Sequence, residues 1–295
     1  MNNTTILQGV TALLMMTQDE LALHIEQTVP NVTKGNGYLL YKTDNESKPM
    51  LCVHLDTINT HYAPDVTIEP SDFEYDETLN ILGVSIDSKL NCLGGDDRAG
   101  VWIALQIIHY MVTNKSSKYN VCFFRDEEIG CLGSSLYKQS VDYIPNTTCY
   151  IGLDRKSSEG SQEVAIYGND NQELIDMFTK GGYSISMGSI TDAAELADET
   201  TSCINLSVGY DNEHTTSEVL YLDCMYDTLE KLLEVEIAQG KQFDGTLDYW
   251  LGSSEGFSLY DYSDGFEEEN IIFREYLEAL GYDPEQILTE GLYYV

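Results

Sequence analysis

Positive charge is scarce in this sequence. Its 295 residues include 15 lysines and arginines against 50 aspartates and glutamates, which gives a formal net charge of −35 at pH 7. A surface of that sign repels phosphate backbones and anionic lipid, so we expect neither nucleic acid nor a membrane as a partner. It also favours solubility and attracts cations. Acidic proteins of this kind also occur in high-salt habitats, and the charge alone does not show whether this protein comes from one.

Paired cysteines, a basic N-terminal segment and long apolar runs are missing as well. The seven cysteines are an odd number and form no C-x-x-C pair, which is typical of small buried side chains in a reducing compartment. No lysine or arginine precedes Lys34, and no apolar run approaches the roughly 20 residues that a membrane span needs. The sequence therefore predicts a cytoplasmic protein with neither a signal peptide nor a membrane span.

What is present is an alternation of apolar strands with helices. With 42% apolar residues, the chain can bury a full core. Strand patterns cover 38–41, 50–56, 81–86, 119–124, 148–153, 163–167, 183–186 and 202–208, and helical patterns cover 95–112, 133–139, 171–180, 219–238 and a segment that ends near Thr28. The alternation predicts an α/β fold with a mostly parallel sheet that helices cover on both faces.

The composition changes at Gln239. From there to Val295, glycines interrupt a segment that is dense in tyrosine, aspartate and glutamate, with one short helical pattern at 273–280. We expect one domain over residues 1–238 and an acidic, tyrosine-rich C-terminal appendage over residues 239–295. The appendage either packs on the domain or forms a partly ordered acidic tail, and its residues indicate no chemistry.

Polar side chains gather where the predicted strands end. Asp96 and Asp97 open a helix directly after Gly94 and Gly95, and four strands finish in further polar residues. These strand-end residues are His54, Asp56, Glu127, Glu128, Asp154 and His214. Since ligands bind outside the carboxyl ends of the strands in open α/β sheets, we expect these side chains to converge there.

Two imidazoles and several carboxylates in one place suit a pair of divalent ions. Zinc accepts both kinds of donor, and one carboxylate can bridge two ions about 3.5 to 4 Å apart. His54 and Asp56 are two positions apart and lie on the same side of their strand, so Asp56 can accept the spare imidazole proton of His54. Of Glu127 and Glu128, one can coordinate metal while the other serves as general base.

Each of these residues has an ordinary structural explanation when it is taken alone. A histidine in an apolar strand is more often a satisfied core residue, and adjacent glutamates more often form a solvated turn. An aspartate at a strand end is more often a helix cap. The joint occurrence in this order favours the metal site. His24, His61 and His109 lack such neighbours, and we assign them no function.

The series of motifs resembles a known family. After His54-Leu55-Asp56 come Gly-Gly-Asp-Asp-Arg-Ala-Gly at 94–100, Asp-Glu-Glu-Ile-Gly at 126–130, Leu-Asp at 153–154 and His-Thr at 214–215. This order is similar to that of the co-catalytic zinc exopeptidases, the clan that holds the M20, M28 and M42 metallopeptidases, and it spans roughly residues 54–233. Thr191-Asp192-Ala193 and the segment 205–209 also resemble the part of these enzymes that precedes the last ligand.

The resemblance implies a three-layer αβα fold with a central, mostly parallel mixed sheet and a metallopeptidase-like catalytic domain over residues 1–238. It implies two divalent ions, zinc by preference with Co²⁺ and Mn²⁺ as alternatives, and a cis peptide bond between Asp96 and Asp97. Carried over residue by residue, Asp96 bridges the ions, His54 and Asp154 complete one, Glu128 and His214 complete the other, Glu127 is the general base and Asp56 orients His54.

The spacing departs from the larger members of the clan. The 60 positions from Asp154 to His214 are too few for the lid or dimerisation domain of M20 enzymes, and the 42 positions from His54 to Asp96 leave no room for the M42 insertion. The chain therefore resembles a lidless M28-like catalytic domain, or one like the tripeptidase branch of M20. Arg155, next to Asp154, is a candidate for binding a substrate carboxylate, and a structural salt bridge is the alternative.

The predicted function is two-zinc hydrolysis of amide bonds, with an aminopeptidase on short peptides as the favoured form. In the predicted mechanism, Glu127 activates a metal-bridging water, which attacks the scissile carbonyl. An amidohydrolase on N-acyl amino acids is the alternative within the same chemistry. A non-catalytic metal-binding or assembly module is the alternative of a different class, which the complete set of ligands and base disfavours. The sequence leaves the oligomeric state open.

Overall fold

The computed structural model describes residues 3–44, 47–63, 65–168, 170–238 and 240–245, and every structural statement below concerns these residues. All described residues belong to the first of the two units into which the chain divides, residues 1–247. The expected helix at 273–280 and most of the expected appendage lie outside the described residues.

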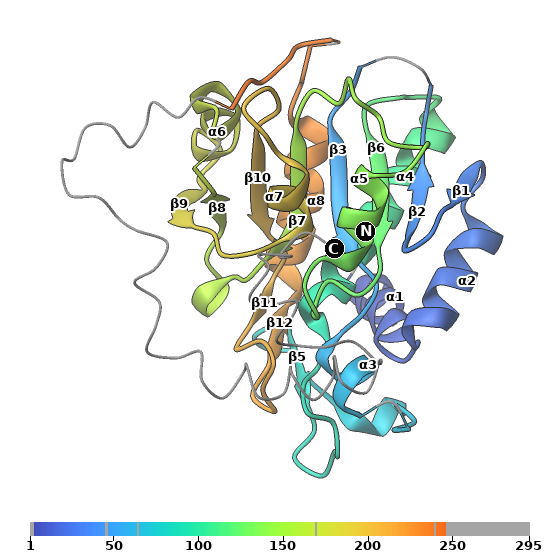
Figure 1. Cartoon of the computed structure of the whole chain (residues 1–295). Coiled ribbons are helices and arrows are strands. Elements are labelled where there is room, and N and C mark those ends of the chain that lie inside the picture. Colours follow the sequence, from blue (N-terminus) through green and yellow to red (C-terminus); the bar gives the residue numbers. More distant parts are fainter. Residues whose placement is uncertain (1–2, 45–46, 64, 169, 239, 246–295) are drawn as a thin grey trace, which may run out of the picture. The chain divides into compact units, whose positions relative to one another are not determined.

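An eight-stranded mixed sheet forms the centre of the first unit, with the strand order β1-β2-β6-β3-β7-β10-β8-β9 (Figure 1). Its strands are β1 (Val32–Lys34), β2 (Tyr38–Tyr41), β3 (Met50–His54), β6 (Asn120–Phe124), β7 (Tyr150–Arg155), β8 (Glu163–Ile166), β9 (Ser184–Met187) and β10 (Cys203–Ser207). The neighbours β6, β3, β7 and β10 run parallel, as do β8 and β9. The β1–β2, β2–β6 and β10–β8 pairs are antiparallel. The predicted mostly parallel mixed sheet is confirmed.

The central strands are apolar on both faces. In β3, Leu51 and Val53 belong to one buried cluster, whereas Met50 and Cys52 belong to the other. Alternate side chains of a strand point to opposite faces, so this pattern requires a covering layer on each side of the sheet. All seven cysteines of the chain are buried and free, as the sequence predicts.

Helices supply the two covering layers. The helices are α1 (Asn3–Leu14), α2 (Gln18–Thr28), α3 (Ile58–Tyr62), α4 (Gly95–Asn114), α5 (Leu132–Lys138), α6 (Gln172–Thr179), α7 (Asp192–Leu196) and α8 (Leu222–Glu234). On one face α4 contacts β3 and β7 as well as α1 and α8, and on the other face α5 contacts α7, which contacts β3, β7 and β10. The three-layer αβα arrangement is therefore confirmed (Figure 1). None of the described helices is long and apolar enough to cross a membrane.

A second, antiparallel sheet of four strands was largely unexpected. Its order is β11 (Tyr210–Asp211), β12 (Val219–Tyr221), β5 (Ile81–Val84) and β4 (Phe73–Asp76). Only the strand at 81–86 was predicted. The predicted helix at 219–238 was wrong at its start, because residues 219–221 pair with β5 and α8 begins only at Leu222.

The described residues of the C-terminal segment, 240–245, pack on the rest of the first unit. Phe243 is fully buried in the cluster that contains α4 and α8. Its amide donates to the carbonyl of Thr148, and its carbonyl accepts from the amide of Ser202. Residues 240–245 therefore extend beside the ends of β7 and β10.

Candidate active site

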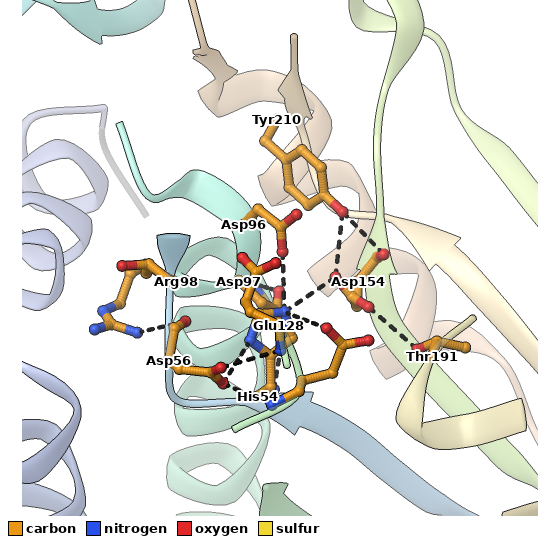
Figure 2. Close-up of polar contacts among 12 residues, drawn as sticks. His54, Asp56, Asp96, Asp97, Arg98, Glu128, Asp154, Thr191 and Tyr210 are labelled. Carbon is orange, nitrogen blue, oxygen red and sulfur yellow. Dashed lines mark hydrogen bonds and ion pairs between the residues drawn. The ribbon is translucent and has the colours of Figure 1, made fainter. Parts of the chain in front are cut away.

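The polar strand ends meet at one edge of the central sheet. Because β3, β6 and β7 are parallel neighbours, their carboxyl ends bring His54, the Glu127–Glu128 pair and Asp154 together. Asp96 reaches the same place from the first turn of α4, and His214 from the loop between β11 and β12. Figure 2 shows the side chains of Asp96 and Asp154 directed toward the His54 ring.

The Asp96 carboxylate lies between two groups of side chains. Its Oδ1 atom is 2.9 Å from Nε2 of His54, which is 3.5 Å from Oδ1 of Asp154. Its Oδ2 atom is 3.3 Å from Nε2 of His214, which is 3.0 Å from Oε2 of Glu128. Each carboxylate oxygen of Asp96 therefore faces one histidine and, beyond it, one further acid.

Asp97 has a different environment from Asp96, although the two are adjacent and joined by a cis peptide bond. Asp97 is fully buried. Its Oδ2 atom accepts the amide proton of His54, and its Oδ1 atom accepts that of Gly100. Its carboxylate comes close enough to His54 and Asp154 to join them around an ion. The two backbone hydrogen bonds favour a structural role for Asp97. Asp96, by contrast, lies between the two histidines.

Asp56 connects the ends of β3 and β6. It is fully buried, and its Oδ1 and Oδ2 atoms accept the amide protons of Glu127 and Glu128, each at 3.0 Å. Nδ1 of His54 lies 3.3 Å from Oδ1, and Nε2 of His61 lies 2.8 Å from Oδ2. Burial raises the pKa of Asp56, but the close approach and positive charge of His54 and the hydrogen bond and charge of His61 outweigh it and hold that pKa well below its usual range. His61, to which the sequence assigned no function, therefore contacts the site.

The surroundings of Glu127 suit proton transfer. Its Oε2 atom is 4.0 Å from Nε2 of His54, and its Oε1 atom lies 3.6 Å from Sγ of Cys131, which donates a weak hydrogen bond. Burial raises the pKa of Glu127 well above its ordinary value; the positive charge of His54 opposes this, while the charges of Asp154 and Asp192 add to it. A carboxyl group with a raised pKa can both accept and return a proton near neutral pH.

Three side chains fix the orientation of Asp154. The hydroxyl of Thr191 donates to Oδ2 at 3.1 Å, and the hydroxyl of Tyr210 donates to Oδ1 at 3.2 Å (Figure 2). The side-chain amide of Asn205 accepts the backbone N–H of Asp154 and donates to its carbonyl. Thr191 and Asn205 lie in segments that the resemblance singled out, whereas nothing local in the sequence indicated Tyr210.

Glu218 is a buried acid that the sequence did not indicate. Its two carboxylate oxygens accept the amide protons of Gly94, at 2.9 Å, and Asp96, at 3.1 Å, so it fixes the loop that carries Asp96. Burial raises the pKa of Glu218 to about 8. The sequence of the loop is restricted in turn: Gly94 has a φ of 81°, and a Cβ on Gly95 would lie 2.9 Å from the Glu218 carboxylate.

A second buried acid, Asp192, lies at the start of α7. Burial raises its pKa to about 8; the charge of His54 opposes the increase, and the charges of Asp56 and Asp154 add to it. Neither of its carboxylate oxygens has a hydrogen-bond partner in the described part of the chain.

The donor set fits divalent cations. Two imidazole nitrogens and three carboxylates lie within reach of one another, and Oε1 of Glu128 is buried with no hydrogen-bond partner in the described part of the chain. Burial and the charge of Asp96 both raise the pKa of Glu128. Burial lowers the pKa of His214, but its contacts with Asp96 and Glu128 outweigh this and raise it to about 11. Buried acids at such short range require neutralising charge, and imidazole with carboxylate is the donor set that zinc accepts.

A cavity of about 140 Å³ opens at these residues. Its wall includes Glu127 and all of the proposed ligands except His54, together with Arg155, Lys156, Tyr167 and Ile190. The guanidinium of Arg155 donates from Nε and Nη2 to Oε2 of Glu163, at 3.1 and 3.0 Å. The salt bridge that the sequence left open as an alternative for Arg155 is therefore present, at the edge of the cavity.

The sequence profile of peptidase family M28 matches residues 39–203, more than half of the chain. The chain belongs to peptidase family M28. This M28 protein is thus a peptidase of the co-catalytic zinc exopeptidase clan, and family membership implies that it uses a divalent metal. The predicted clan and the prediction of an enzyme are confirmed.

Solved peptidase structures share the fold of the M28 protein. The aminopeptidase PepT of Bacillus cereus is 13% identical, with 79% of this chain and 97% of that chain covered and a TM-score of 0.57. A tripeptidase of Staphylococcus aureus is 11% identical, with the same coverage and a TM-score of 0.60. The TET1 peptidase of Pyrococcus horikoshii is 13% identical, with 79% and 100% covered and a TM-score of 0.54. At these identities the likeness concerns the fold alone. No curated protein sequence matches the chain.

Proposed function

We propose that this M28 peptidase is a two-metal aminopeptidase that acts on short peptides. The observation that carries the proposal is the position of Asp96, whose two carboxylate oxygens face His54 at 2.9 Å and His214 at 3.3 Å. A carboxylate in that position suits a bridge between two ions, with Asp154 completing one group and Glu128 the other.

Zinc is the ion that we propose for both positions, because its preferred ligands are the imidazoles and carboxylates present here. Bound there, two divalent ions supply polarisation of the scissile carbonyl and a water of lowered pKa. Cobalt and manganese accept a similar donor set, so activity restored to metal-free protein by each metal in turn would identify the native ion.

Glu127 is the proposed general base. It takes a proton from the attacking water on a carboxylate oxygen and then delivers that proton to the leaving amine nitrogen. Its burial and raised pKa support both steps. Asp56 supports the base by accepting the backbone amide protons of Glu127 and Glu128 while it faces Nδ1 of His54.

Replacing Glu127 tests the mechanism. We expect Glu127→Ala to lower kcat by about 10²- to 10⁴-fold, the usual contribution of a general base, while the protein still binds about two zinc ions. The matched control is Glu199→Ala, which removes an exposed glutamate. Peptide hydrolysis and metal analysis of the same preparations give both results. A Glu127→Ala protein that keeps most of its activity would contradict the proposal.

For substrate selection we propose that Arg155 attracts the carboxylate of a short peptide. Its place on the cavity wall, beside Asp154, supports this role, and Glu163 holds its guanidinium in place. We expect Arg155→Gln to raise KM for free-acid di- and tripeptides and to leave KM for the matching peptide amides unchanged. N-acyl amino acids, the alternative substrate class, belong in the same assay, and faster turnover of these than of peptides would favour an amidohydrolase.

A further inference from the structure

A second histidine, His61, contacts the buried carboxylate of Asp56. His61 lies in the short helix α3, five residues after Asp56, and its side chain is 11% exposed. Its Nε2 atom is 2.8 Å from Oδ2 of Asp56. Because an ionised carboxylate only accepts hydrogen bonds, Nε2 of His61 must be the donor.

Each oxygen of Asp56 has two partners. Oδ1 accepts the amide proton of Glu127 and faces Nδ1 of His54, while Oδ2 accepts the amide proton of Glu128 and the Nε2 proton of His61. These four contacts come from three segments of the chain: the end of β3, the turn after β6, and α3. Without His61, Oδ2 would retain a single partner, and the carboxylate plane would be held more strongly on one side than on the other.

We propose that His61 is a positioning residue that acts through Asp56. Its hydrogen bond fixes the plane of the Asp56 carboxylate, and that plane keeps the Nδ1 proton of His54 in contact with Oδ1. His54 then presents the bare Nε2 atom to Asp96 and Asp154, the form in which imidazole binds metal. The same carboxylate fixes the backbone of Glu127 and Glu128. The inference rests on the proposed two-metal function.

A third ion among Asp56, His61 and Asp126 would explain the contact differently, since their donor atoms lie close enough together to hold one. The surrounding hydrogen bonds disfavour it. Both oxygens of Asp56 are already contacted twice, and Oδ1 of Asp126 accepts the side-chain amide of Gln18 at 2.9 Å. An ion there would have to displace the bonds that hold the Glu127–Glu128 turn.

Two substitutions separate the hydrogen bond from the shape of the ring. His61→Phe removes the donor and keeps a ring of similar size, whereas His61→Gln keeps an N–H donor. His109→Phe, on the exposed face of α4, is the matched control. We expect His61→Phe to weaken the binding of one of two zinc ions to the metal-free protein by up to about 10-fold, less than the loss of a ligand's direct partner would cause, because His61 acts one step further out through Asp56. Binding to His61→Gln should stay close to that of the native protein.

Equilibrium dialysis against zinc measures the binding, and steady-state kinetics should show a lower kcat with an unchanged KM for His61→Phe. Equal zinc binding by His61→Phe and His109→Phe would overturn the inference, and so would a His61→Gln protein that binds as weakly as His61→Phe. If the protein binds zinc as expected but cleaves no peptide, the proposed function fails while the positioning role stands.

The native protein provides a test that does not depend on the variants folding. Nitrogen-15 NMR of the imidazoles should show a protonated, hydrogen-bonded Nε2 in His61 and a protonated Nδ1 in zinc-loaded His54. An unprotonated Nε2 in His61 would overturn the inference.

Discussion

The proposed metal site has two halves that share Asp96: His54 with Asp154, and His214 with Glu128. The two halves differ in burial. His54 has 1% of its side chain exposed, and its partner Asp154 has 11%. His214 has 45% of its side chain exposed, although its partner Glu128 is buried. One half therefore lies inside the domain, and the other reaches the surface through its histidine.

The halves also differ in what supports them. In the first half, His54 contacts Asp56 and Asp97 in addition to the proposed ligands, and Asp154 is held by Thr191 and Tyr210. In the second half, His214 lies in a loop with a φ of 63°. Each half has one buried polar atom without a hydrogen-bond partner in the described residues, Nδ1 of His54 and Oε1 of Glu128, so the difference rests on the bonds made by Asp97, Thr191 and Tyr210. Surrounding hydrogen bonds keep ligands in binding geometry. We therefore expect the first half to bind its ion more tightly and the second half to exchange it more readily.

The largest expected effect comes from the residue that the halves share. We expect Asp96→Ala to lose both zinc ions and to lower kcat/KM by more than about 100-fold, because the loss of a shared ligand exceeds the loss of one outer partner. Asp87→Ala, at an exposed position, is the control. Metal analysis after dialysis measures the outcome. If Asp96→Ala retained one ion at full occupancy, Asp96 would belong to one half only.

Next in size is the difference between the two histidines. We expect His54→Ala to lose its ion and to lower the free energy of unfolding by about 2 kcal/mol or more, since it leaves a cavity and buried acids without a partner. His214→Ala should weaken one ion and change the free energy of unfolding by less than about 1 kcal/mol, because its side chain is half exposed. Zinc titration and urea unfolding of the two variants measure both quantities. Equal losses would show that burial does not distinguish the halves.

A further effect concerns pH. The pKa values of Asp192 and Glu218 are each raised to about 8, so between pH 5 and 8 the folded, metal-free protein retains protons that the unfolded chain releases. The free energy of unfolding should therefore fall as pH rises through this window, by at most about 1.4 kcal/mol per pH unit for each group. Because the pKa of His214 is also raised, its contribution to the free energy of unfolding likewise falls as pH rises above 6.5.

Asp192→Asn removes one of the two buried titrating carboxyl groups, so it should reduce the change of the free energy of unfolding with pH. Asp87→Asn, at an exposed position, should leave that change as it is. Urea unfolding with a chelator present, at pH 5, 6, 7 and 8, measures the slope. Added zinc should stabilise the native protein more at pH 8 than at pH 5, because it binds the deprotonated ligands. A metal-free protein that becomes more stable from pH 5 to 8 would show that these acids are not buried as described.

The proposed ligands could be found in the sequence because each ends a strand or opens a helix. His54 and Asp154 follow apolar runs directly, Glu127 and Glu128 follow one after two intervening residues, and the run itself is the local signal. Tyr210 and Glu218 lack such a signal, since each reaches the site through tertiary packing. His61 was assigned no function because it lacks neighbours like those of the proposed ligands, and only the fold of α3 brings it to Asp56.

The main sheet was predictable for the same reason, and the small sheet was not. The strand at 38–41 was predicted with the bounds that the structure has. Residues 219–221 were assigned to a helix because they continue without a break into the apolar pattern of α8. Their strand conformation depends on pairing with β5, a partner far away in the sequence.

The small sheet also determines when the site can be completed. It pairs residues 81–83 with residues 219–221, which flank the loop of His214 and follow Glu218 directly. Pairings between distant segments form late, because a long loop must close before the contacts are gained. During synthesis, β3, β6 and β7 leave the ribosome before β12, so His54 and Asp154 can meet while His214 is still being added. A nascent chain of this peptidase would thus have a first metal position before it has a second.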